Sequence, residues 1–297
     1  MVKFTGVIPA LVTPLCQDET LNVPVFRQLM NDLLEEGADG FYVGGATGEG
    51  IALRRGVREQ LAEEAINFVN GRKPCIVHVA SADFNEAVEL AKHAERCGAD
   101  AISAIPPLFF SYDEDDIYNY YKKLADAIHI PLMIYYNPAA GFQINAEFAA
   151  RMFEIDNITS IKWTSSDYYG MLRLKELTNG EINIINGPDE MLLMGLNAGA
   201  DGGIGSTYNL ILPKIKAVYE NYVAGNIQQA QMAQMEANKI IAVLIKYKII
   251  PCIKALLECK GYEVGNAVFP MKRYDEEQRL QMLKELERVG YRNESNF

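Results

Sequence analysis

Short apolar segments alternate with amphipathic segments along most of this chain, and this alternation is the feature that most constrains its fold. The connections are only a few residues long, a pattern typical of parallel strands joined by covering helices. Because the pattern repeats eight times, we expect closure into an α/β TIM (β/α)8 barrel. An open, doubly wound sheet is the alternative, but no Gly-x-Gly-x-x-Gly follows the first strand. The expected strands are residues 4–13, 41–43, 75–80, 101–105, 131–136, 158–163, 182–186 and 202–206, and the expected helices are 23–36, 58–69, 85–97, 113–128, 146–153, 168–177, 190–198 and 210–223.

A weak internal repeat supports the barrel. Gly-Ala-Asp recurs at 37–39, 98–100 and 199–201, each time between a helix and the next strand, where glycine can adopt the left-handed conformation that ends a helix. Beyond the eighth unit the pattern is helical only, at 227–248, 252–259 and 274–289. We therefore expect residues 1–224 to form the barrel and residues 225–297 to add three helices packed on it.

Composition indicates which binding partners and which cellular compartment to expect. The chain has 297 residues and a net charge of −11, which argues against binding to nucleic acid or to an anionic membrane. No apolar run approaches the roughly 20 residues of a membrane span. The five cysteines lack CxxC or metal-ligand spacing. The first residues run directly into strand-like sequence, so we expect no signal peptide. These features predict a cytoplasmic protein with reduced thiols.

The sixth expected strand contains a lysine. Lys162 is flanked by Ile161 and Trp163, so it must pair, reach solvent or react. Burial favours the uncharged amine, and an uncharged amine at a strand end can form a Schiff base with a carbonyl substrate. A salt-bridged lysine at a sheet edge is the alternative for this segment taken alone.

Other polar residues follow the strands at the end where barrel active sites lie. The glycine-rich loop around Ala46 and Thr47 can present N–H groups and a hydroxyl to a carboxylate, or is an ordinary loop. Tyr135 and Tyr136 end the fifth strand, where a hydroxyl can pass a proton or an aromatic ring can simply pack on the rim. Later strand ends contribute Thr164, Gly187, Asp189, Glu190 and Ser206.

Two of these residues have a structural alternative. Asp189 and Glu190 can accept hydrogen bonds from a polyhydroxylated substrate, or can cap the helix that they open. The three histidines, His78, His93 and His129, share no ligand spacing, so we expect structural histidines and no metal site.

Three motifs resemble a known family. They are Gly-Gly-x-Thr-Gly-Glu after strand two, Tyr-x-x-Pro after strand five and Lys-x-Thr-Ser-x-Asp after strand six. They are similar to those of the dihydrodipicolinate synthase/N-acetylneuraminate lyase family of Schiff-base aldolases, over essentially the whole chain. Residues 187–190 and 200–209 resemble the N-acetylneuraminate lyase branch. The synthase branch has an arginine shortly after Tyr-x-x-Pro, and residues 139–142 contain none.

The resemblance implies a reaction and the residues that perform it. Lys162 would form an imine with the C2 ketone of open-chain N-acetylneuraminate (sialic acid), which would be cleaved to pyruvate and N-acetylmannosamine. Tyr135 would take the proton of the C4 hydroxyl, and no organic cofactor or metal would be needed. Thr47 and the amide of Ala46 would hold the carboxylate. The polyol would contact Thr164, Gly187, Asp189, Glu190 and Ser206. The family also implies a homo-oligomer, usually a tetramer.

Two positions depart from the family pattern. The family usually has a hydroxyl residue at Ala46, and at Phe110 a tyrosine that reaches a neighbouring subunit's site. Tyr112 is an alternative hydroxyl, and Tyr136 an alternative to Tyr135. The departures keep two further hypotheses open: an aldolase or hydratase for another 2-keto acid, and an impaired member that only binds such acids.

Overall fold

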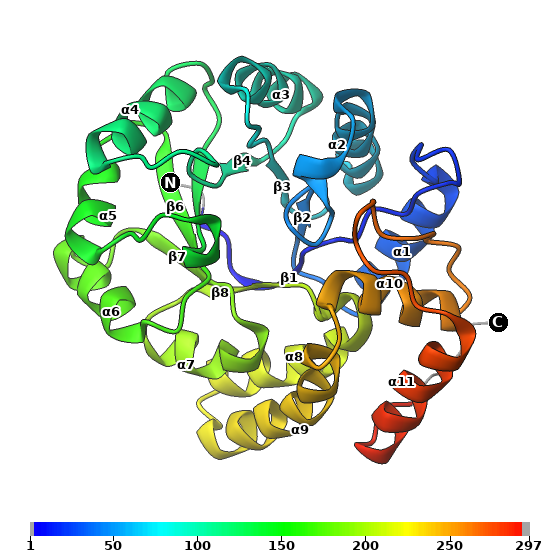
Figure 1. Ribbon diagram of the computed structural model, residues 1–297. Coiled ribbons are helices and arrows are strands. Elements are labelled where there is room, and N and C mark those ends of the chain that lie inside the picture. The colour runs from blue at the N-terminus through cyan, green and yellow to red at the C-terminus, as the bar shows by residue number, and fades with distance from the viewer. Residues whose placement is uncertain (1–2, 293–297) are drawn as a thin grey trace.

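The computed structural model describes residues 3–292, and within them eight parallel strands form a ring enclosed by helices (Figure 1). The sheet order is β1-β8-β7-β6-β5-β4-β3-β2. A parallel bridge between Ala10 and Tyr42 closes the ring, and the Leu11 N–H donates to the Tyr42 carbonyl at 2.9 Å. The predicted TIM barrel is confirmed. Its strands are β1 Gly6–Pro9, β2 Phe41–Val43, β3 Cys75–His78, β4 Ala101–Ala104, β5 Leu132–Tyr136, β6 Ile158–Trp163, β7 Asn183–Asn186 and β8 Gly202–Gly205.

The helices of the barrel follow the predicted order with adjusted ends. The segment predicted as one helix over 190–198 is divided into the 3-10 helix Asp189–Met191 and α7 Leu192–Asn197. The division falls at Met191, the last residue of the 3-10 helix, which departs from helical geometry (φ −125°, ψ 21°). A capping box between Asp113 and Asp116 begins the fourth helix. The helices are α1 Val23–Glu35, α2 Arg55–Val69, α3 Phe84–Cys97, α4 Glu114–Ala125, α5 Ala146–Met152, α6 Tyr168–Leu177, α7 Leu192–Asn197 and α8 Tyr208–Val223.

The Gly-Ala-Asp repeat has a structural role in each of its three copies. Its glycines all have the left-handed φ that ends a helix: Gly37 (+94°), Gly98 (+91°) and Gly199 (+93°). Its aspartates then accept hydrogen bonds from strand N–H groups: Asp39 from Val7, Asp100 from Cys75 and Asp201 from Ile184. The repeat therefore ends a helix and fixes neighbouring strands to each other.

Three further helices, α9 Ile227–Ile245, α10 Ile249–Cys259 and α11 Glu276–Arg288, follow the barrel and pack beside α8 and one another (Figure 1). The outer ends of the two ranges expected from the sequence, residues 1–2 and 293–297, lie outside the described residues. Within residues 3–292, no helix combines the length and apolar character needed to cross a membrane.

Candidate active site

Lys162 lies inside the barrel near the carboxyl end of β6. Its side chain is buried, with 6% of the residue exposed, and its register partners are Tyr135 on β5 and Ile185 on β7. The Nζ atom lies 4.1 Å from the ring centroid of Tyr135 and 5.1 Å from that of Tyr42. Aromatic faces of this kind attract a cation by about 0.5–2 kcal/mol. The amine therefore sits in an aromatic enclosure without a carboxylate as its ion-pair partner among the described residues.

The two tyrosines of β5 face opposite sides of the sheet. Tyr135 faces the barrel interior, beside Lys162. Tyr136 packs its ring 4.8 Å from Trp163, centroid to centroid. This is the alternation expected of consecutive strand residues. Of the two candidates, Tyr135 is the one beside the amine.

Tyr42 was not among the residues singled out from the sequence. Its hydroxyl donates to Ser103 Oγ at 3.0 Å, and burial raises its pKa well above the usual range, so the ring stays neutral. Its position on a strand whose alternate residues face inward was the available signal.

The loop after β2 folds back on itself. A Cβ on Gly50 would lie 1.8 Å from the Gly44 carbonyl oxygen, and Gly44 itself has φ +69°, so glycine is required at both positions. The loop buries Thr47, whose Oγ1 lies 2.7 Å from Ser206 Oγ on the loop after β8. Two predicted binding residues from distant parts of the sequence are thus brought together.

A cavity of about 310 Å³ opens beside this loop. Predicted site residues Ala46 and Tyr135 both line it, and Ala46 is exposed to solvent. The lining is Gly45, Ala46, Glu49, Gly50, Ile51, Ala52, His78, Ile105, Tyr135, Asn137, Ala139 and Ala140.

Thr164 and Gly187, from the ends of β6 and β7, are in direct contact. A Cβ on Gly187 would lie 2.0 Å from Thr164 Oγ1, so the glycine permits the threonine's approach. That hydroxyl is buried and has no hydrogen-bond partner among the described residues.

Asp189 and Glu190 differ in their surroundings. Asp189 is buried, and its Oδ2 accepts from both the N–H (2.7 Å) and the hydroxyl (2.6 Å) of Thr207. Burial raises the Asp189 pKa to about 6, against the Thr207 hydrogen bonds that lower it. Neither carboxylate caps a helix, because the N-cap of the 3-10 helix is Pro188. Asp189 thus joins the loops after β7 and β8, while Glu190 is only half-buried.

His78 ends β3 beside the rings of Tyr42 and Tyr135, and was expected from the sequence to be structural. It is 4% exposed, and burial, reinforced by Arg58 and Lys162, lowers its pKa to about 3. It is therefore a neutral imidazole. A strand-end position was the signal that could have singled it out.

Phe110 lies in the connection between β4 and α4 with 70% of its surface exposed. Its ring packs edge-to-face on Phe109 and Tyr112, at centroid distances of 5.0 and 6.3 Å. Neither Phe110 nor Tyr112 lines the cavity beside Tyr135.

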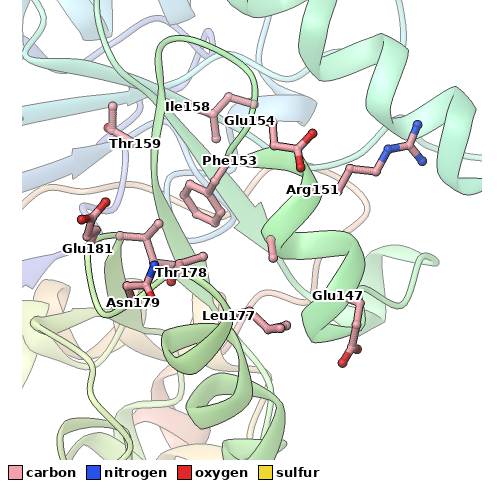
Figure 2. Close-up of a pocket in the computed structure, with 12 residues that line it drawn as sticks. Glu147, Arg151, Phe153, Glu154, Ile158, Thr159, Leu177, Thr178, Asn179 and Glu181 are labelled. Carbon is pink, nitrogen blue, oxygen red and sulfur yellow. The ribbon is translucent and has the colours of Figure 1, made fainter.

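A larger cavity, of about 470 Å³, lies at the amino-terminal end of β6, away from the carboxyl end that carries Lys162. Figure 2 shows the residues that line it. It is lined by α5, α6 and the first residues of β6, including Arg151, Ile158 and Thr159. Ile158 precedes Lys162 by four strand residues, about 13 Å at 3.3 Å per residue. This cavity is larger than the one beside Tyr135 but therefore lies far from the Lys162 amine.

One cluster of possible metal ligands lies outside the barrel, between α2 and α3. Atoms of Glu63, His93 and Cys97 lie within 4.8 Å of one another. The i, i+4 spacing of His93 and Cys97 on α3 is the sequence signal for this cluster. The His93 Nε2 and Glu63 Oε1 atoms are 2.9 Å apart and already form a pair.

Comparison with known proteins gives the family. The Dihydrodipicolinate synthetase family matches residues 3–289. The chain belongs to this family. A Rhizobium meliloti (strain 1021) relative named N-acetylneuraminate lyase is 34% identical to this family member over 275 residues, covering 93% of this chain and 92% of the relative. An Escherichia coli (strain SMS-3-5 / SECEC) relative of the same name is 34% identical, with 86% of each chain covered.

Solved structures agree with this assignment. Clostridium difficile crystal structures in complex with mannosamine are similar, with a TM-score of 0.92, 30% identity and coverage of 97% of this chain and 100% of that one. A Proteus mirabilis N-acetylneuraminate lyase has a TM-score of 0.92 at 29% identity, covering 98% of this family member and 100% of that chain. The sequence-based family prediction is confirmed.

Proposed function

We propose that this family member is a class I aldolase that cleaves N-acetylneuraminate into pyruvate and N-acetylmannosamine through an imine on Lys162. The observation that carries the proposal is the buried Lys162 amine beside the Tyr135 ring, at the same barrel end as the Thr47 and Ser206 hydroxyls. The names of the relatives support the substrate.

The reaction follows from these positions. The Lys162 amine attacks the C2 ketone of the open-chain sugar acid, and loss of water leaves a protonated imine. The Tyr135 hydroxyl first gives its proton to the departing water, and the resulting phenolate accepts the proton of the C4 hydroxyl as the C3–C4 bond breaks. The electron pair of that bond enters the imine to form an enamine, and N-acetylmannosamine leaves. Protonation at C3 and hydrolysis release pyruvate. The imine is the electron sink, so the proposal requires no metal or organic cofactor.

Binding assignments complete the proposal. Thr47 and the Ala46 amide hold the C1 carboxylate, while Thr164, Gly187, Glu190 and Ser206 contact the polyol. Asp189 supports the same wall, since one of its oxygens is committed to Thr207. We propose a cytoplasmic homo-oligomer, a tetramer by analogy with the family.

A second candidate is cleavage or dehydration of a different 2-keto acid. Ala46 supplies no hydroxyl to the cavity, and Phe110 supplies none from its exposed loop. Lost acid–base groups typically cost about 10²–10⁴ in rate, so these residues favour either altered substrates or an impaired enzyme that binds keto acids.

The deciding experiment measures pyruvate release from N-acetylneuraminate by the purified protein. We expect release that disappears in Lys162→Ala and persists in Lys272→Ala, which removes an exposed lysine. Borohydride should trap pyruvate on the wild-type protein but not on Lys162→Ala. Trapping without release from the sugar acid would favour another keto acid, and release by Lys162→Ala would refute the imine mechanism.

A further inference from the structure

His78 is a buried polar side chain that the proposed reaction does not use. Its ring lies between two aromatic rings of the site, 6.3 Å from Tyr42 and 6.0 Å from Tyr135, centroid to centroid. The imidazole also borders the same cavity as Ala46, the position at which the loop after β2 lacks a side-chain hydroxyl.

The ring nitrogens of His78 have no partner. Both are buried, and neither makes a hydrogen bond within residues 3–292. The Gly44 carbonyl lies close enough to oppose the downward shift of the His78 pKa, but it forms no hydrogen bond of standard geometry with the ring. An unsatisfied buried polar group typically costs about 1–3 kcal/mol, which a ligand in the cavity can recover.

The cavity offers few other donors for an anion. Its remaining polar side chains are Glu49, Tyr135 and Asn137, and Glu49 is already paired with Lys254 at 2.6 Å. A neutral imidazole still donates one N–H, and donation to a carboxylate needs no proton transfer.

We propose that His78 is a substrate-binding residue that donates a hydrogen bond to the carboxylate of the bound 2-keto acid, on the side where Ala46 has no hydroxyl. This inference rests on the proposed Schiff-base function and adds a carboxylate contact to it. It makes His78 a determinant of selectivity for keto acids over neutral ketones.

The test compares borohydride trapping of pyruvate and of its neutral methyl ester on Lys162. His78→Leu removes both ring nitrogens, His78→Gln keeps a donor, and His129→Leu removes an exposed histidine as a control. We expect His78→Leu to raise the half-saturating pyruvate concentration about 10–100-fold, as for a lost hydrogen bond to a charged group. His78→Gln should recover most of this loss, and the methyl ester should be trapped equally by all four proteins.

Two results would overturn the inference while leaving the Schiff-base proposal intact. One is wild-type pyruvate affinity in His78→Leu. The other is an equal loss for pyruvate and its methyl ester, which indicates a general distortion of the site. Absence of trapping in the wild-type protein, in contrast, would overturn both proposals.

Discussion

A buried ion pair joins the loop after β2 to the C-terminal helices. Lys254 Nζ on α10 lies 2.6 Å from Glu49 Oε1, and the two side chains are 1% and 0% exposed. Lys254 also donates to the Asn266 carbonyl at 3.0 Å, while Glu49 Oε2 accepts from the Val268 N–H. Burial lowers the pKa of Lys254, and the Glu49 carboxylate opposes that shift. The loop that holds Thr47 thus depends on a partner from the end of the chain.

Removing one charge of this pair leaves the other buried without a partner. Such a change typically costs about 3–5 kcal/mol, whereas an exposed pair contributes about 0–1 kcal/mol. We therefore expect Glu49→Gln and Lys254→Met each to lower the free energy of unfolding by about 3–5 kcal/mol. The double variant should lose much less than the sum, because no uncompensated charge remains.

Urea unfolding followed by circular dichroism measures the stability of the wild type, the two single variants and the double variant, which together form a double-mutant cycle. Lys246→Met is the matched control, because Lys246 pairs with Glu285 at 3.4 Å across two other C-terminal helices but is 63% exposed. It should change stability by less than about 1 kcal/mol. A loss of unfolding free energy in Lys254→Met no larger than that in Lys246→Met would contradict the buried pair's role. So would a double variant whose loss equals the sum of the Glu49→Gln and Lys254→Met losses.

Three further outcomes can be measured. Gly187→Ala should lower the free energy of urea unfolding by about 1–3 kcal/mol, because its Cβ would meet Thr164 Oγ1 at 2.0 Å. Burial raises the Asp189 pKa from 3.8 to about 6 in the folded protein, so the folded state holds this proton more tightly than the unfolded state does. The resulting stabilisation is fully present at a pH below 3.8 and is lost as the pH rises through 6. Between pH 4 and pH 7 the free energy of unfolding of the wild type should therefore fall by about 2 kcal/mol relative to Asp189→Asn. Ala46→Ser combined with Phe110→Tyr should raise pyruvate release from N-acetylneuraminate if these positions are lost proton-relay groups, and an unchanged rate would contradict that account.

The barrel could be predicted because its signals are local. Apolar strands, amphipathic helices and helix-ending glycines each occupy a short stretch of sequence, and their order determines the topology. Strand length was predicted less well. Residues 10–13 are as apolar as Gly6–Pro9, but β1 ends at Pro9 and the pairing beyond it is reduced to the isolated bridge between Ala10 and Tyr42. An apolar run encodes burial rather than the length of regular strand pairing.

The candidate site was predictable where a strand end carries its own chemistry, as at Lys162 and Tyr135. It was not predictable where a side chain's role depends on a distant partner. Nothing near Glu49 in the sequence indicates Lys254, and nothing near Asp189 indicates Thr207. His78 has an ordinary apolar strand around it, and only the closed barrel places it beside Tyr135.

The residues proposed for imine chemistry and those proposed for carboxylate binding lie on different strands of the barrel. The groups proposed for imine chemistry, Lys162 and Tyr135, lie on the paired strands β5 and β6. The groups proposed to select the carboxylate, Ala46 and His78, lie at the ends of β2 and β3, which also pair with each other. Because the two sets occupy different strand pairs, substitutions at the second can change which keto acid binds without removing the amine. The departure at Ala46 is therefore compatible with a retained Schiff-base reaction and a changed substrate preference. Phe110, in the connection after β4, likewise lies off the strands that carry Lys162 and Tyr135.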